Sequence, residues 1–316
     1  MKANKSNKNI IKILKGKNAF IAIMLIFPLL LFVVFWIVPN IIGMYLPFTR
    51  FRMLADGGRV MEWVGLTNFK DYFKQMFGMR GSEVWIATRN SIIIYLVSLV
   101  IQMPLYVLFS YYIYKGYLGS KTMRLIILIP STVAGFSMVI LFKYFIGFNG
   151  PLSLIFGESY KSPLFSNNDA LAFCVLIFYS TWTSFSTFLI IFPNAMMGIS
   201  PDVVESSRID GVSGMFTDLR YIVIPLIWPT LSTFLINGFK SIMSNTNNLD
   251  TFYGSGAAPK NLHTIATLIN RLLAQGGDFA WGFSAAGSLI LMFILVPAAW
   301  LFKKLLDRMD PTRDAY

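Results

Sequence analysis

Residues 21–39 read IAIMLIFPLLLFVVFWIVP and contain no charged side chain. A helix needs about 20 apolar residues to cross about 30 Å of hydrocarbon, so this segment predicts a membrane span. The whole first span is taken as 18–49, and five further segments are nearly free of charge and long enough to cross. These five are 90–114, 125–148, 170–192, 221–244 and 280–302. The sequence therefore predicts six spans, of which the fifth is the least regular because it carries Pro225, Pro229 and Lys240.

The composition excludes a soluble globular domain and a disordered chain. Only 13% of the residues are charged and 55% are apolar, whereas soluble chains carry about a quarter of charged residues. Cys174 and His263 are the single cysteine and the single histidine. An intramolecular disulfide, a zinc site and a Cys/His dyad are therefore excluded, and we expect no bound metal. The predicted class is an all-α polytopic membrane protein.

The distribution of Lys and Arg predicts that both termini lie in the cytoplasm, because cytoplasmic loops carry an excess of these residues. The tail 1–18 has six lysines and no acid, and basic residues also follow the second and the last span. The loop 50–89, with seven basic and four acidic residues, is contrary evidence, but long loops translocate with less regard for charge. We expect one six-helix domain over 19–305 between the tails 1–18 and 306–316. The net charge of +12 is ascribed to contact with anionic lipid and not with nucleic acid.

The segment between spans four and five has a pattern of its own. Residues 194–229 read NAMMGISPDVVESSRIDGVSGMFTDLRYIVIPLIWP. Ser200 suits a helix N-cap, Pro201 the first helical position and Asp202 the positive end of the helix dipole. Gly211 supplies a left-handed stop, so a short helix is predicted over 201–210, and Gly214 interrupts the chain again. On these features alone, an amphipathic helix at the membrane surface is an equally good interpretation.

The same residues resemble the EAA loop of bacterial ABC importer permeases. That pattern is Glu-Ala-Ala, three residues, Gly, nine residues and Ile-x-Leu-Pro, and here it is matched by Glu205-Ser206-Ser207, Gly211 and Ile222-Val223-Ile224-Pro225. Serine replaces both alanines, Ile224 replaces the leucine, and the spacer is one residue longer. The Asp210-Gly211 pair favours the carbohydrate branch of this family.

Two further segments are similar to the carbohydrate branch. Residues 63–69, WVGLTNF, resemble the "VGL-x-NF/Y" segment of the maltose-permease and glycerol-phosphate-permease lineage, and residues 254–259 weakly resemble its "GGP" segment. The resemblance covers about residues 20 to 305 and implies a type I ABC importer permease architecture of six helices. It also implies a multi-pass location in the bacterial cytoplasmic (inner) membrane.

The resemblance implies a role for the loop 193–221. It would form a coupling helix seated in a groove of a cytosolic ATPase, with Glu205 offering a carboxylate, Ser206 and Ser207 allowing close approach, and Asp210 and Gly211 turning the chain back. The implied partners are a second, similar permease subunit, two ATPase subunits and an extracytoplasmic solute-binding protein, for which the loop 50–89 is a candidate surface. ATP and Mg²⁺ would bind in the ATPase, so this chain itself would hold no cofactor.

Polar residues on two spans are candidates to line a path for an uncharged sugar, which needs hydroxyl, amide and aromatic groups. Helical spacing places the hydroxyl residues of span four on one face, with two aromatic residues flanking them, and the polar residues of span five on a similar face. The candidates are Tyr179, Ser180, Trp182, Thr183, Ser184 and Thr187 on span four, and Asn237, Lys240 and Ser241 on span five. A purely structural role in helix packing is an equally good interpretation of the hydroxyl residues. Lys240 either lines a wet cavity or extends to the outer surface, since burying it costs about 2.5–3.5 kcal/mol.

Enzymatic chemistry in this chain is not expected. The nearest string to a phosphate-binding loop, residues 254–261, has Pro259 in place of a glycine and Asn261 in place of the hydroxyl residue. The predicted function is therefore the permease subunit of an ABC importer for a carbohydrate, favouring an oligosaccharide. The alternative is an ion-coupled secondary transporter of a small polar solute, which would need acidic residues inside the spans, and a membrane enzyme would need clustered His, Asp or Glu.

Overall fold

The computed structural model describes residues 17–54, 58–78, 81–157, 160–164, 168–277 and 279–311 and consists mainly of helices. Four helical segments are long and apolar enough to cross a membrane, and two bent helix pairs raise the possible number of spans to six. The continuous segments are Phe20–Phe48, Glu83–Tyr114, Asp169–Met197 and Ala280–Arg308. They coincide with predicted spans one, two, four and six, so the prediction of a polytopic helical protein is confirmed.

Predicted spans three and five are broken helices. α7 (Ser120–Thr132) meets α8 (Gly135–Phe145) at 106°. The helical segment Met215–Leu226 meets α14 (Trp228–Ser244) at 76°. Pro225 and Pro229 flank this second bend. Proline lacks an N–H and its ring clashes with the carbonyl four residues earlier, so the two prolines favour a break in the helix there.

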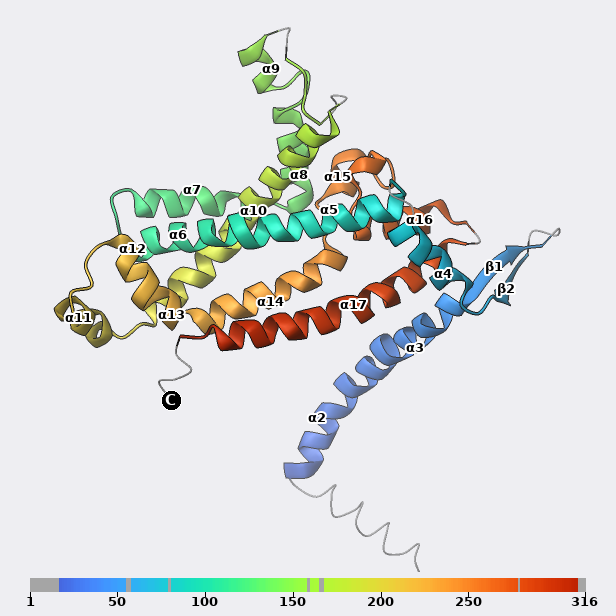
Figure 1. Ribbon diagram of the computed structural model, residues 1–316, viewed down its shortest axis with the longest axis horizontal. Coiled ribbons are helices and arrows are strands. Elements are labelled where there is room, and N and C mark those ends of the chain that lie inside the picture. The colour runs from blue at the N-terminus through green and yellow to red at the C-terminus, as the bar shows by residue number, and fades with distance from the viewer. Residues whose placement is uncertain are drawn as a thin grey trace, which may run out of the picture.

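Long helices form the body of the molecule, most of them running along its longest axis and one of them obliquely (Figure 1). They are α5 (Glu83–Val97), which continues through the π-helical turn η4 (Ser98–Gln102) into α6 (Met103–Tyr114), together with α10 (Asp169–Met197), α14 and α17 (Ala280–Arg308). Glycine allows close contact at two points: a Cβ on Gly238 would lie 2.5 Å from the Tyr95 ring, and one on Gly287 would lie 2.1 Å from the Tyr72 ring. Small residues at helix contacts let membrane helices approach closely.

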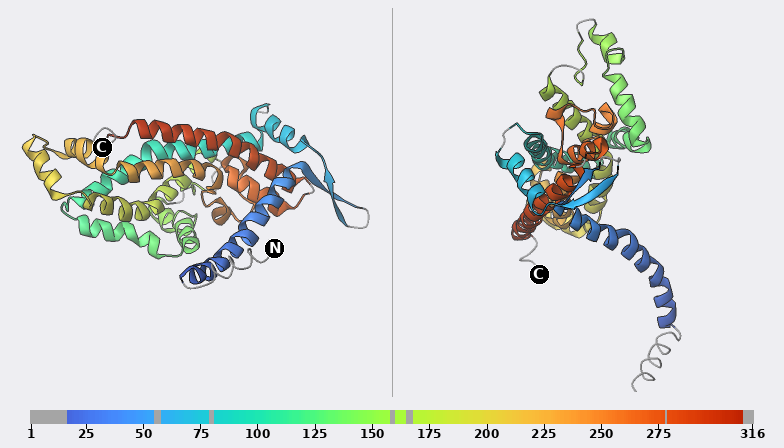
Figure 2. Two further views of the ribbon diagram at one scale, coloured as in Figure 1. Left: turned by 90° about the horizontal axis from the view of Figure 1, so that it is seen from below. Right: turned by 90° about the vertical axis from the view of Figure 1, so that its right-hand side faces the viewer.

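The first helical segment leaves this body as a separate arm (Figures 1 and 2). It comprises α2 (Lys17–Phe32), the π-helical turn η1 (Val33–Ile37) and α3 (Val38–Tyr45). Large apolar side chains such as Phe27, Phe35 and Ile41 are more than half exposed. Apolar surface of this extent needs lipid or another protein to cover it.

One end of the body carries a β-hairpin. After the 3-10 turn η2 (Leu46–Phe48), strands β1 (Thr49–Met53) and β2 (Arg59–Trp63) pair antiparallel and lead to α4 (Thr67–Phe73) and the π-helical turn η3 (Lys74–Gly78). The buried Asn68 amide donates to the carbonyls of Pro47 and Thr49, at 2.9 Å each. Arg50 donates to the side chains of Asn68 and Asp71, at 2.6 Å each. These bonds fix the base of the hairpin against α4.

The same end of α5 is covered by the segment that follows α14. This segment contains α15 (Leu249–Tyr253), the 3-10 turn η6 (Lys260–Leu262) and α16 (Ile265–Gln275). The Asn90 amide on α5 donates to the carbonyls of Asn261 and His263, at 2.8 and 3.0 Å. The remaining elements are the short α9 (Pro151–Phe156), beyond α8, and α11 (Pro201–Ile209), α12 (Met215–Asp218), η5 (Leu219–Val223) and α13 (Ile224–Leu226) between α10 and α14.

Candidate functional site

Helix α11 lies beyond the body of the molecule, at the end opposite the hairpin (Figure 1). It spans Pro201–Ile209, one residue shorter than the helix predicted over 201–210, because Asp210 is its C-cap. Ser200 is the N-cap, as predicted, but its side chain makes no capping hydrogen bond. The helix has no buried residue, and Ile209 is 86% exposed. An exposed helix of this length gains little from packing, so its surface is available to a partner.

Two glycines join α11 to the rest of the chain. Gly211 has φ +88° and Gly214 has φ +93°. Left-handed values of this kind favour glycine, since any Cβ would be strained there. A Cβ at either position would meet no atom within 4 Å, so the requirement comes from the backbone alone. The stop predicted at Gly211 and the break predicted at Gly214 are both present.

The predicted coupling residues all lie on α11 or directly after it. Glu205, Ser206 and Asp210 are exposed, whereas Ser207 is half-buried and faces the body of the protein. The hydroxyls of Ser206 and Ser207 donate to the carbonyls of Val203 and Val204, at 3.1 and 2.7 Å. Both hydroxyls are therefore satisfied within their own helix, which leaves the small side chains compatible with close approach of another helix.

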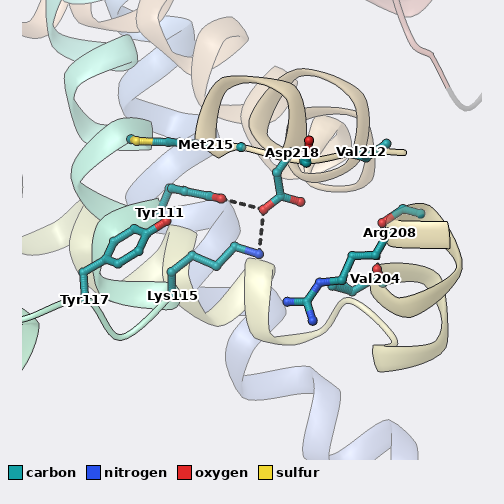
Figure 3. A pocket seen from close by; sticks show the side chains of 11 residues that line it. Tyr111, Lys115, Tyr117, Val204, Arg208, Val212, Met215 and Asp218 are labelled. Atoms are coloured by element: carbon teal, nitrogen blue, oxygen red, sulfur yellow. Dashed lines mark hydrogen bonds and ion pairs between the residues drawn. The ribbon is translucent and has the colours of Figure 1, made fainter. Parts of the chain in front are cut away.

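A cleft of about 500 Å³ separates α11 from the bundle. Its walls come from the end of α6, from α11 and from the chain leading into α12 (Figure 3). The Asp218 carboxylate accepts hydrogen bonds from the Tyr111 hydroxyl at 2.5 Å and from the Lys115 ammonium at 2.6 Å. Only 14% of the Asp218 side chain and 20% of the Lys115 side chain are exposed. The ion pair therefore connects the chain after α11 firmly to α6.

Sequence reasoning missed this ion pair. In the sequence, Lys115 is one of the basic residues that follow span two, and Asp218 is an acid in the segment after Gly211. The available signal was an acid seven residues after Gly211 and a cation at the end of span two, both expected on the same side of the membrane. Nothing in the sequence indicates that these two segments are neighbours.

The polar residues predicted on span four lie along α10 with unequal exposure. Ser180, Thr183 and Ser184 are half-buried and Thr187 is exposed. The hydroxyls of Ser180 and Thr183 donate to carbonyls one turn earlier in their own helix. Tyr179 is buried in an aromatic cluster with Phe142, Trp182 and Phe252. In the isolated chain Tyr179 therefore packs the core, and Trp182 lies at its edge.

On α14 the predicted polar face is open. Asn237 and Lys240 are exposed, and Ser241 is half-buried and donates to the Gly238 carbonyl at 2.6 Å. α10 and α14 meet through aromatic rings, with Phe234 packed edge-on against the stacked pair Phe188 and Phe192. Among the described residues, no hydrogen bond joins the polar face of α10 to that of α14. The structure therefore places both faces but does not bring them into direct contact.

A second link reaches α10 from α6 and was also missed. The Gln102 amide donates to the Thr181 hydroxyl at 2.7 Å, and the Tyr106 hydroxyl donates to the Thr181 carbonyl at 3.2 Å. Thr181 lies between two of the predicted lining residues, Ser180 and Trp182. The polar face of α10 is thus held in place by Gln102 at the end of η4 and by Tyr106 in the first turn of α6.

Charged residues at the hairpin end have structural roles. Glu83 pairs with Lys260 at 2.8 Å and with Arg271 at 3.0 Å, which ties the start of α5 to η6 and α16. Lys260, the lysine of the imperfect phosphate-loop string, is thereby engaged in an ion pair. His263 is buried, its Nε2 lies 3.0 Å from the Ala258 carbonyl, and burial lowers the pKa of its imidazole below the usual value.

Comparisons with known proteins agree with this architecture, although no family model matches the chain. The permease protein GanP of the galactooligosaccharide transport system of Bacillus subtilis is 22% identical over 306 residues, which is 88% of this chain and 68% of GanP. The permease protein MsmF of the multiple sugar-binding transport system of Streptococcus mutans is 24% identical over 277 residues, covering 86% of this chain and 89% of MsmF.

Solved structures of the same fold are also known. A bacterial ABC transporter that imports the acidic polysaccharide alginate superimposes with a TM-score of 0.74, at 19% identity, over 95% of this chain and 99% of the other. The alginate transporter in complex with a periplasmic protein bound to an alginate pentasaccharide gives 0.71, at 18% identity, over 93% and 96%. The chain is thus a relative of the sugar ABC transporter permeases and has the fold of an ABC importer permease.

Proposed function

We propose that this chain is the transmembrane permease subunit of an ABC importer that brings an oligosaccharide into the cell. The observation that carries this proposal is α11, an exposed helix with the EAA-like residues, held between Gly211 and the end of α10 and projecting from the bundle. A secondary transporter that uses only its own chain has no need for such a helix. The relatives named for sugar transport support the choice of a carbohydrate.

The ATPase contact in this proposal is the outer surface of α11. Glu205 offers a carboxylate to a basic or amide group of the ATPase, and the small Ser206 and Ser207 let the two proteins approach closely. Asp210 and Gly211 turn the chain back toward the membrane. ATP and Mg²⁺ bind in the two ATPase subunits, and their closure moves α11 as a rigid body.

The substrate path in this proposal runs along the polar faces of α10 and α14. The hydroxyls of Ser180, Thr183, Ser184 and Thr187 are available to sugar hydroxyls, and Trp182 offers a ring face. Asn237, Lys240 and Ser241 form the opposite wall. The exposed position of Asn237 and Lys240 supports this role, because a cation on a membrane helix needs water or a polar ligand.

A complete transporter needs further chains. A second, similar permease subunit and lipid would cover the apolar arm of α2 and α3 and close the path beside α14. An extracytoplasmic binding protein would dock at the hairpin end, where the loop 50–89 lies. In this arrangement the chain resides in the bacterial cytoplasmic membrane with α11 and both termini on the cytoplasmic side.

Reversing the charge of Glu205 tests the proposal. Glu205→Lys should abolish ATP-dependent uptake by cells while leaving membrane insertion and thermal unfolding in detergent unchanged, because the side chain is exposed. Asp202→Lys is the matched control: it reverses a charge one turn earlier on the same helix, outside the EAA pattern, and should keep most of the uptake. Uptake that survives ATP depletion but is stopped by an ionophore would instead support the ion-coupled transporter.

A further inference from the structure

We infer that α6 is a second mechanical connection between the coupling helix and the substrate path. At one end it is bonded to the carboxylate of Asp218, and at the other end it is hydrogen-bonded to Thr181. The inference rests on the proposed function and goes beyond it, because the chain-continuous route from α11 leads only into α10 and toward α14. The evidence consists of two sets of side-chain bonds at opposite ends of one helix.

The first set lies at the α11 end of α6. Asp218 ends α12, which follows the two glycines after α11, so any rotation of α11 that bending at these glycines does not absorb pulls on the segment that contains Asp218. Its carboxylate accepts hydrogen bonds from Tyr111, in the last turn of α6, and from Lys115, the C-cap of α6. The Lys115 ammonium also lies over the rings of Tyr111 and Tyr114, at 5.4 and 5.2 Å from their centres. A charge-assisted bond in a largely buried site is stronger than one in water.

Figure 3 shows that the interaction of Asp218 with Tyr111 and Lys115 lies at the wall of the cleft. Tyr111 and Lys115 extend from α6 toward Asp218, while Arg208 extends from α11 on the other side. The cleft separates α11 from α6, so α11 can move with respect to α6. α12 cannot, because the ion pair between Asp218 and Lys115 fixes it to the end of α6. Movement of α11 must therefore bend the chain at Gly211 and Gly214 or drag α6 along.

The second set lies at the other end of α6, at its N-cap Gln102 and at Tyr106 in its first turn. Gln102 and Tyr106 hold the hydroxyl and the carbonyl of Thr181. The rings of Tyr106 and Phe188 are stacked at 4.4 Å, which adds an apolar contact with α10. At 1.5 Å per residue, Gln102 and Lys115 are about 20 Å apart along the helix. α6 can therefore transmit displacement from the cleft to the middle of the predicted substrate path.

The experiment follows the substrate path directly and needs no knowledge of the sugar. In a parent protein with Cys174→Ser, a cysteine introduced as Thr187→Cys reports the exposure of the α10 polar face through its rate of reaction with a maleimide. The full transporter complex, purified with its ATPase, is labelled with and without MgATP and vanadate. We expect nucleotide to change the rate by at least about fivefold, the lower end of typical allosteric coupling factors.

Three variants test the ion pair between Asp218 and Lys115. Asp218→Asn should reduce the nucleotide effect to less than about twofold while the ATPase still copurifies, since coupling between the sites is lost but α11 is intact. The exchange Lys115→Asp with Asp218→Lys should restore most of the effect by re-forming the ion pair. Lys121→Met is the matched control, an exposed cation at the same end of the molecule, and should behave as the parent.

The two ends of α6 should act in series. Gln102→Leu should also reduce the nucleotide effect, and combining it with Asp218→Asn should cause little further loss, because a connection broken once transmits nothing more. The inference would be overturned if the double variant lost as much of the nucleotide effect as the product of the two single losses predicts. A full nucleotide effect in Asp218→Asn would also overturn it. A parent complex that contains no ATPase, or shows no nucleotide effect at all, would overturn the proposed function instead.

Discussion

Substituting Gly211 by alanine should weaken binding of the ATPase without destabilising the protein. Gly211 has φ +88°, and a left-handed conformation costs a residue with a Cβ about 1–2 kcal/mol. A Cβ there meets no atom within 4 Å, so the change introduces strain but no clash. The alanine variant can release the strain only by letting α11 leave its present orientation.

The size of the effect follows from this strain. If the ATPase requires the present orientation of α11, a penalty of about 1–2 kcal/mol weakens its binding about 5- to 30-fold. The global stability should hardly change, because α11 has no buried residue. ATPase affinity is measured by titration of the detergent-solubilised permease, and stability by thermal unfolding of the same samples.

Gly119→Ala is the matched control. Gly119 lies in the connection between α6 and α7 and has φ +80°. A Cβ added there would also have no atom within 4 Å. It should carry a similar strain but leave ATPase affinity unchanged. Equal affinity of Gly211→Ala and the parent, or equal weakening by Gly119→Ala, would refute the reasoning that the orientation of α11 governs coupling.

Three other changes have defined outcomes. Gly282→Ala should lower the free energy of unfolding by about 1–3 kcal/mol, as overpacking does, because the added Cβ would lie 2.1 Å from the Thr49 carbonyl oxygen. Thermal unfolding in detergent measures this loss. A variant as stable as the parent would contradict the close approach of α17 to η2 and β1. Burial lowers the pKa of His263, so the unfolded chain binds more protons and the free energy of unfolding should fall as pH drops from about 6.5 toward the folded-state pKa. His263→Gln should flatten that dependence between pH 7.5 and 5.5, and an unchanged slope would assign it to other groups. Lys240→Gln should impair ATP-dependent uptake of uronate-containing oligosaccharides more than that of neutral ones of equal length, because only the anionic sugars lose a favourable charge, and equal losses in transport assays would place Lys240 outside the path.

Local sequence was sufficient for the membrane class and for the short helix. A run of apolar residues must lie in lipid or in a core whatever its neighbours are, so the spans could be located from composition and length alone. Ser200, Pro201 and Gly211 act on their own backbone, and α11 therefore begins where predicted and ends within one residue of the prediction. The bends near Thr132 and Ile227 were less predictable, since neighbouring helices decide whether a membrane helix tolerates its prolines or breaks.

Tertiary structure alone decided which polar residues face one another. Tyr179 was expected beside the sugar path but lies in an aromatic cluster, because α8 and α15 pack against that face of α10. Lys115 and Asp218 are 103 positions apart in the sequence, and only the packing of α12 against the end of α6 brings them to 2.6 Å. The sequence by itself determined which segments are apolar enough to span a membrane and where α11 begins and ends, because those properties depend on neighbouring residues in the chain. The side-chain bonds that join α12 to the end of α6, and the start of α6 to α10, are contacts between distant segments, and these exist only once the helices have packed.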